Sequence, residues 1–258
     1  MRVGVFQFDC RDNISDNHEA IKRAIISAAE NKVRLLVFQE CATCGYPPVE
    51  TPSIKNIDFK TLDLYLQEIK QLAQKYDMYI ALGTIRKQNS KCYNSMLLID
   101  YKGEIIGNYD KRALWGWDLD NFESGETIGI YDIDDIPVGF RICFEVRFPE
   151  YFRELFKSNI QLCFVSFCDV SEQENMERYN IIKSHLITRA VENVMTVITV
   201  NSISKYQVAP TAVFDLNGYI VCEAPKNQEY LLVYDYNTPT IDFGAEGRIY
   251  NSRRLLTS

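Results

Sequence analysis

Apolar residues recur along the chain with two alternating periods, which predict strands and helices in turn. Short apolar runs typical of strands cover residues 2–9, 34–39, 79–86, 92–100, 104–109, 137–143, 161–167, 195–201, 212–216, 219–223 and 231–236. Apolar positions with helical spacing cover residues 17–31, 61–76, 149–157 and 172–193. The pairs Lys102-Gly103 and Asn217-Gly218 are typical of tight hairpin turns. This order predicts an α/β fold with two central sheets covered by helices.

The chain shows no division into several domains. No Gly/Ser/Pro linker or charge block interrupts it, and no repeat has the period of a solenoid. We expect one domain over residues 1–236, followed by an arm over residues 237–258 that has little periodicity. The arm is a candidate for an oligomer interface.

Composition and charge narrow the classes of partner. The 258 residues are 47% hydrophobic and 24% charged, as in ordinary globular proteins with a substantial core. The net charge of −7 and the lack of long Lys/Arg runs predict that neither nucleic acid nor an anionic membrane is a partner. No apolar stretch approaches the roughly 18 residues of a membrane span, and the N-terminus lacks the pattern of a signal peptide. We therefore expect a cytoplasmic protein.

Cysteine usage raises a question of redox or metal chemistry. Several of the eight cysteines lie in apolar runs, where a free thiol behaves as a small hydrophobic group, so we expect free thiols. Cys41 and Cys44 form a C-x-x-C pair, which also occurs at redox and zinc sites. A zinc site needs a second ligand pair, and the Gly-Tyr-Pro-Pro segment at 45–48 opposes the helix of a thioredoxin-type site. We expect no metal, and the redox role stays open as a lesser alternative.

Three polar residues stand where predicted strands end. Glu40 follows the apolar run 35–39, Lys111 follows the strand that ends near residue 110, and Cys143 closes the run 138–142. In α/β folds, ligands bind beyond the carboxyl ends of the strands. The three positions therefore suggest a site, although each residue taken alone also fits packing or a solvated loop.

Together these residues lie in three blocks that resemble the nitrilase, or carbon–nitrogen hydrolase, superfamily. The blocks are FQECATCGYP over residues 38–47, YDKRALW over residues 109–115 and RICFEVRFPE over residues 141–150. The segment RAVEN over residues 189–193 and Asn201 match a further part of that family. The resemblance runs from the first strand to about residue 232 with the blocks in the family's order. It implies a four-layer αββα sandwich and a homodimer or larger homo-oligomer.

The resemblance also implies a catalytic triad of Glu40, Lys111 and Cys143. At pH 7 only about 3% of a free thiol is ionised, so Cys143 needs a general base, and Glu40 takes this role. Lys111 and the backbone N–H of Phe144 are the expected donors to the oxyanion. Water would then hydrolyse the thioester, so no cofactor is needed.

Two positions depart from the family's pattern. The family usually has a second Glu four residues before a Phe; with Phe122 as that Phe, the position is Asp118, and Asp120 is the other candidate. The alternative is a solvated acidic loop. The usual His after the Lys block is Ala113 here, so that position has no acid–base role.

Other functions remain open at this point. A Cys–His hydrolase would need His18 or His185, but His18 is expected to face solvent and His185 to make a helix–helix contact. The same triad could also transfer the acyl group to another nucleophile or hydrolyse a nitrile. A non-catalytic binding module is a further alternative, disfavoured by the intact triad.

The nucleophile's neighbours carry the substrate prediction. Arg147 matches a position that holds the substrate's carboxylate in several carbamoylase and ω-amidase relatives, and a guanidinium suits a carboxylate. The alternative is a structural salt bridge from Arg147 to Glu145 or Glu150. Tyr46 and Trp115 are candidate walls of the pocket. We expect a small linear amide or N-carbamoyl compound that bears a carboxylate.

Overall fold

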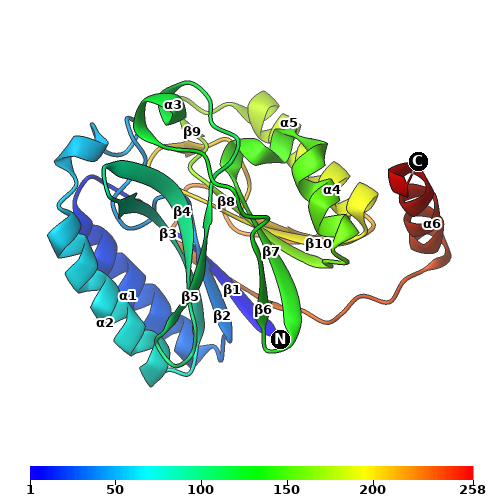
Figure 1. Cartoon of the computed structure of the whole chain (residues 1–258), viewed down its shortest axis with the longest axis horizontal. Helices are drawn as coiled ribbons and strands as arrows, with labels where there is room; N and C mark the ends of the chain where they lie inside the picture. The colour runs from blue at the N-terminus through cyan, green and yellow to red at the C-terminus, as the bar shows by residue number, and fades with distance from the viewer. Residues whose placement is uncertain (258) are drawn as a thin grey trace.

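The predicted strands assemble into two sheets that pack face to face (Figure 1). The computed structural model describes residues 1–257, and within them each of the two large sheets has six strands. The first sheet has the order β14 (Tyr230–Asp235), β1 (Arg2–Gln7), β2 (Leu35–Phe38), β3 (Tyr79–Gln88), β4 (Lys91–Ile99) and β5 (Ile105–Asp110). The second has the order β13 (Ile220–Glu223), β12 (Ala212–Phe214), β10 (Thr196–Asn201), β8 (Leu162–Phe167), β7 (Ile136–Ile142) and β6 (Ile130–Ile133).

Two helices cover the outer face of each sheet, which completes four layers and confirms the predicted fold class (Figure 1). Helices α1 (Ile14–Glu30) and α2 (Phe59–Lys75) pack on the first sheet, and α4 (Pro149–Lys157) and α5 (Met176–Asn193) pack on the second. The core between the sheets is apolar from both sides, with Val5, Val37 and Leu98 facing Phe140 and Phe164. Burial on both faces explains why the central strands have continuous apolar runs.

The centre of each sheet is parallel, so strand ends gather at one edge. β1, β2 and β3 are parallel neighbours in the first sheet, as are β7, β8 and β10 in the second. The two edges meet across the sandwich, where the Ser166 hydroxyl at the end of β8 donates to the Phe38 carbonyl at the end of β2, at 2.9 Å. Residues that follow β2, β7 and β8 therefore share one location.

Helix ends follow local side-chain chemistry. Asn13 caps the first helix, because its side chain accepts hydrogen bonds from the backbone N–H groups of Ser15 and Asp16. The helix predicted over residues 172–193 begins only at Met176, because Asn175 accepts from the Arg178 N–H and sets the start. Gly103 and Gly218 adopt positive φ in the two predicted hairpin turns.

Several short elements were not predicted. They are the 3-10 helices η1 (Ile54–Asn56) and η2 (Cys143–Arg147), the helix α3 (Trp117–Asn121), the edge strand β6 and the strands β9 (Val170–Ser171) and β11 (Tyr206–Gln207). The arm over residues 237–258 contains the helix α6 (Phe243–Thr257), and Ser258 lies outside the described residues. Ala245 and Ile249 of α6 pack in a small apolar cluster with Val194 and Leu216, which anchors the helix. No helix between residues 1 and 257 is both long and apolar enough to cross a membrane.

Candidate active site

Glu40 lies two residues beyond β2 and is almost fully buried, with 1% of its surface exposed. Its Oε1 accepts from Lys111 Nζ at 2.9 Å and from Asn94 Nδ2 at 2.7 Å. Its Oε2 accepts from the backbone N–H of Cys168 at 2.8 Å. A buried carboxylate with three donors is fixed in position and needs no solvent. The two sheets thus hold one carboxylate between them.

Lys111 follows β5 and is also 1% exposed. Besides Glu40, its ammonium contacts Asp118 Oδ2 at 2.8 Å and lies 5.5 Å from the centre of the Tyr46 ring. The Tyr46 hydroxyl donates to Asp118 Oδ1 at 2.8 Å. Burial alone would lower the pKa of Lys111, but attraction by Glu40, Cys143 and Asp118 raises it well above its usual value. Lys111 is therefore a permanent cation between two carboxylates.

Cys143 occupies the junction between β7 and η2 in a strained backbone conformation. Its φ is +47°, a region that non-glycine residues rarely adopt and that is found at functional sites. Its side chain is partly buried. Burial first, and then repulsion by Glu40, raise the pKa of the Cys143 thiol well above its usual value, while Lys111 opposes them. The thiol is therefore protonated at neutral pH and needs a base to become a nucleophile.

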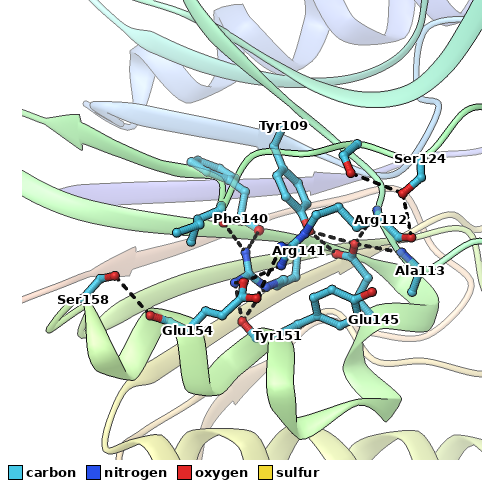
Figure 2. Close-up of polar contacts among 12 residues, drawn as sticks. Tyr109, Arg112, Ala113, Ser124, Phe140, Arg141, Glu145, Tyr151, Glu154 and Ser158 are labelled. Atoms are coloured by element: carbon cyan, nitrogen blue, oxygen red, sulfur yellow. Dashed lines mark hydrogen bonds and ion pairs between the residues drawn. The ribbon is translucent and has the colours of Figure 1, made fainter.

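Glu145 fixes the turn that carries Cys143 against the segment that carries Lys111 (Figure 2). The carboxylate is fully buried and accepts from the backbone N–H of Ile142 and of Arg112, both at 2.8 Å, and from Ala113 N–H at 3.4 Å. The Tyr109 hydroxyl contacts both carboxylate oxygens, at 2.7 and 2.8 Å. One side chain thereby sets the relative position of two predicted catalytic residues.

Two arginines extend this network towards α4 (Figure 2). The fully buried guanidinium of Arg141 donates to the carbonyl oxygens of Ile128 and Tyr151, and the guanidinium of Arg112 pairs with Glu154 at 2.5 Å. These contacts join β7, α4 and the segment after Lys111. The first residues of η2 are therefore held in place both by β7 and α4 and by the segment after Lys111.

The neighbours of Cys143 bear on the remaining predictions. Phe144 is the second residue of η2, so its N–H belongs to the first turn, whose N–H groups intrahelical bonding leaves unpaired. Arg147 closes η2, is partly buried and forms no ion pair with any residue between 1 and 257. Its expected alternative partners do not hold it: Glu145 is occupied by other donors, and Glu150 is exposed. The alternative interpretation, in which Arg147 forms a structural salt bridge to Glu145 or Glu150, is therefore wrong.

The structure separates the remaining site candidates. Asp118 is 3% exposed and contacts Lys111, whereas Asp120 is exposed, so the structure places Asp118, and not Asp120, beside Lys111. The solvated-loop interpretation of Asp118 is wrong. Tyr46 lies beside Lys111. Trp115 is 72% exposed in the loop before α3, and its backbone carbonyl accepts from the Asp118 N–H at 3.2 Å.

The two histidines lie apart from this cluster. His18 was expected to face solvent, but it is 3% exposed and its Nε2 donates to Glu68 Oε2 at 2.9 Å, because α2 packs over it. His185 lies on α5, where burial first, and then the cations of Arg147 and Arg189, lower its pKa. Neither provides the base of a Cys–His pair in this arrangement.

The cysteine pair of the C-x-x-C segment is buried among apolar side chains. All eight cysteines are free, and burial raises the pKa of Cys44 to about 11. Within residues 1–257, no group of three or more His, Cys, Asp or Glu side chains is arranged to hold a metal ion. The Cys41 and Cys44 thiols therefore lack the ionisation that redox chemistry or metal binding uses.

Sequence reasoning missed four contributors to the site. Asn94 and the Cys168 N–H bind Glu40, Glu145 fixes the turn, and Asp169 follows the end of β8 close enough to influence the Cys143 pKa. Asn94 had a recognisable signal, since it is an amide within the otherwise apolar run of β4. A backbone N–H has no sequence signal.

A family model and several known proteins match this chain in sequence. The family model described as carbon-nitrogen hydrolase matches residues 2–243. The 2-oxoglutaramate amidase of Bacillus subtilis (strain 168) is 28% identical over 196 residues, which cover 74% of this chain and 72% of that protein. Deaminated glutathione amidase of Dictyostelium discoideum is 27% identical over 183 residues, which cover 64% of this chain and 62%, less than two thirds, of that protein.

A solved structure shares the whole architecture. A mutant of the amidase from Nesterenkonia sp. AN1, which shows covalent addition of the acetamide moiety of fluoroacetamide at its active-site cysteine, has a TM-score of 0.82 and 20% sequence identity. The match covers 100% of this chain and 95% of that chain, and at this identity it shows the fold. With a family match over nearly its whole length and the four layers in place, the chain belongs to the carbon-nitrogen hydrolase family.

Proposed function

We propose that this protein hydrolyses the C–N bond of a small linear amide or N-carbamoyl compound that bears a carboxylate, through a thioester on Cys143. The observation that carries the proposal is the buried cluster of Glu40, Lys111 and Asp118 beside a strained, partly buried cysteine. The cluster provides a base, a cation and a nucleophile without any metal ion.

Acylation begins with a proton transfer from the Cys143 thiol to Glu40, since the raised thiol pKa requires a base. The sulfur attacks the carbonyl carbon, and the carbonyl oxygen takes up the negative charge. An ammonium has three N–H donors; Glu40 and Asp118 occupy two, which leaves one Lys111 donor for this oxygen. The Phe144 N–H is the second donor. Collapse of the intermediate breaks the C–N bond, and Glu40 returns the proton to the departing nitrogen.

Deacylation uses the same residues in reverse order. Glu40 takes a proton from water, and the resulting hydroxide attacks the thioester carbonyl, whose oxygen again faces Lys111 and Phe144. Breaking the C–S bond releases the carboxylic acid, and the proton returns to the sulfur. The three donors that fix Glu40 keep it oriented through both steps.

Asp118 is proposed to act as the fourth member of the site. Its carboxylate, held by the Tyr46 hydroxyl, draws the Lys111 ammonium away from an exclusive pair with Glu40. Asp118 thereby shares the Lys111 cation with Glu40 and holds the ammonium between the two carboxylates. Aspartate is one methylene shorter than the glutamate usual in the family. This segment must therefore approach Lys111 more closely.

Arg147 is the proposed carboxylate-binding residue. It closes the turn that begins at Cys143 and forms no ion pair within residues 1–257, although its charge acts on Asp169. The names 2-oxoglutaramate amidase and deaminated glutathione amidase describe relatives that act on amides, and the first substrate carries a carboxylate remote from its amide. Tyr46 is proposed to line the same pocket, and Trp115 to reach it only by a movement of its exposed loop.

The test of the chemistry compares the wild-type enzyme with the Cys143→Ala variant. Ammonia release from a panel of ω-amides, N-carbamoyl acids and nitriles should occur for the first two groups and disappear in the variant, whose circular dichroism should stay native. Turnover by Cys143→Ala at a comparable rate would refute the nucleophile. Release of ammonia from nitriles alone would refute the amide substrate.

The test of the substrate class compares an ω-amide acid with its neutral methyl ester. A charged hydrogen-bonded pair contributes about 1.5–3 kcal/mol, so kcat/KM should favour the acid by roughly 10- to 150-fold. Arg147→Ala should remove most of this preference, and Arg147→Lys should restore it only in part, because an ammonium lacks the planar fork. Arg23→Ala is the matched control, since Arg23 is an exposed cation on α1. Equal rates for acid and ester in the wild type would remove the role of Arg147 while leaving the triad in place.

We also propose that the protein works in the cytoplasm as a homodimer or larger homo-oligomer. The free thiols suit a reducing compartment. Phe243 of α6 is 93% exposed and Tyr250 is 63% exposed, which supports the arm over residues 237–258 as part of an interface. Sedimentation of the wild type and of a Phe243→Ser variant would test this: a wild-type monomer would refute the assembly.

A further inference from the structure

A second cavity lies outside the first sheet, away from the proposed catalytic cluster. Its volume is about 360 Å³, and α1, α2 and strands β3, β4 and β5 contribute to its walls. Figure 1 shows α1 and α2 lying side by side along this face of the sheet. None of Glu40, Lys111, Asp118 and Cys143 lines it. Its contents would therefore not compete with substrate.

The wall of this cavity is mostly apolar. Leu62, Leu66 and Ile69 of α2 face Leu82 of β3, and side chains of this kind favour an apolar ligand. The hydroxyl groups of Thr43 and Thr84, which also line the cavity, lie 2.8 Å apart and satisfy each other. His18, the other buried polar side chain of the wall, is therefore the group that can recognise a polar atom of a ligand.

His18 presents one nitrogen atom without a partner. The residue is 3% exposed, its ring stacks on Tyr65 with centroids 4.0 Å apart, and Nε2 donates to Glu68. Its Nδ1 is buried and has no hydrogen-bond partner among residues 1–257. A carboxylate only accepts, so Nε2 carries a proton, and in this imidazole tautomer Nδ1 is an acceptor. Buried acceptors are normally satisfied, so this atom points to a missing donor.

We propose that this cavity binds a small, largely apolar molecule whose single hydroxyl or amide N–H group donates to His18 Nδ1. The apolar wall would cover the body of the molecule, and the imidazole would fix its orientation. A ligand of this class resembles an alkylphenol or an aliphatic alcohol in size and polarity. The carboxylate-bearing substrate proposed for the catalytic site does not fit this description.

The test uses p-cresol as the donor probe and 4-methylanisole as its matched partner, in which a methyl group replaces the hydroxyl proton. Dissociation constants are measured by isothermal titration calorimetry on the wild type and on His18→Phe, which keeps an aromatic ring on Tyr65 but removes Nδ1. Relative to 4-methylanisole, p-cresol should bind roughly 2- to 13-fold more weakly to His18→Phe than to the wild type. The same ratio in both proteins would overturn the proposal.

Two further variants locate the site. Leu66→Trp should fill the cavity and abolish binding of both probes, whereas His185→Phe, a histidine change on the other sheet, should leave both affinities unchanged. Undiminished binding by Leu66→Trp, or no binding of either probe to the wild type, would overturn the proposal. If His18→Phe fails to fold, the loss of binding in a folded Leu66→Trp protein supports the cavity. Thr84→Val, in the cavity wall but with its hydroxyl paired to Thr43, should retain the p-cresol preference.

Discussion

Replacing Glu145 by Gln would test whether one buried carboxylate sets the position of the nucleophile. The change keeps the size of the side chain but replaces one accepting oxygen by an NH₂ donor. Oε1 now serves the backbone N–H groups of Arg112 and Ala113, and Oε2 serves that of Ile142. Whichever way the amide turns, a donor must face a buried backbone donor.

The cost can be worked out from these contacts. If the amide oxygen keeps the Arg112 side, the Ile142 N–H is left unpaired, which costs about 1–3 kcal/mol. The retained bonds lose their ionic character, which costs on the order of another 1–3 kcal/mol. The sum, about 2–6 kcal/mol, is a large part of an ordinary stability of about 5–15 kcal/mol. Ile142 directly precedes Cys143, so turnover should fall along with stability.

Urea unfolding followed by circular dichroism, together with ammonia release at saturating substrate, measures both effects. Tyr109→Phe is the matched control, because it removes one donor to Glu145 and leaves all three backbone bonds. It should cost about 1–2 kcal/mol and little turnover. A Glu145→Gln protein with wild-type unfolding midpoint and rate would refute the structural reasoning. A protein equally stable but inactive would instead place Glu145 in the chemistry.

Three other expectations concern the site itself. Asp118→Asn should lower kcat by roughly 10²-fold because Lys111 loses one of its two anchors, whereas the exposed Asp120→Asn should keep the wild-type rate in the same assay. Cys41→Ser and Cys44→Ser should retain most of the ammonia release, and an inactive but folded variant would restore the redox role. Because the Cys143 pKa is raised, the rate of alkylation by iodoacetamide should keep rising through pH 9, and a plateau near pH 7 would contradict this.

Much of the fold follows from local patterns. Strands buried on both faces and helices buried on one give different apolar periods, so the central elements were predicted close to their observed bounds. The hairpins at Gly103 and Gly218 were predictable because the turn itself requires positive φ at a residue that tolerates it. The helix α6 was not predictable in this way, because its two packed positions, Ala245 and Ile249, are too few to form a clear apolar pattern in the sequence.

The residues of the candidate site also fall into those that the sequence predicts and those that it does not. Glu40, Lys111 and Cys143 were predictable as candidates because each follows a strand whose end is visible in the sequence. The partners that orient them were not, because Asn94 lies 54 residues from Glu40 and Cys168 lies 128 residues from it. No local pattern encodes such a pairing. The prediction that His18 faces solvent failed for the same reason, since its partner Glu68 lies on a helix 50 residues away in the sequence.

The charges of the site show what the arrangement adds to a set of residues. Lys111 lies between two carboxylates, so the buried cluster carries one net negative charge beside Cys143. Burial first, and then repulsion by Glu40, raise the pKa of the Cys143 thiol and keep the nucleophile neutral at rest, which protects it from adventitious alkylation and oxidation. In the proposed reaction, the third Lys111 donor and the Phe144 N–H stabilise the carbonyl oxygen when it becomes an oxyanion, while Glu40 becomes neutral by taking the proton. The negative charge therefore moves from base to oxyanion around a fixed cation, and little reorganisation of the buried surroundings is needed.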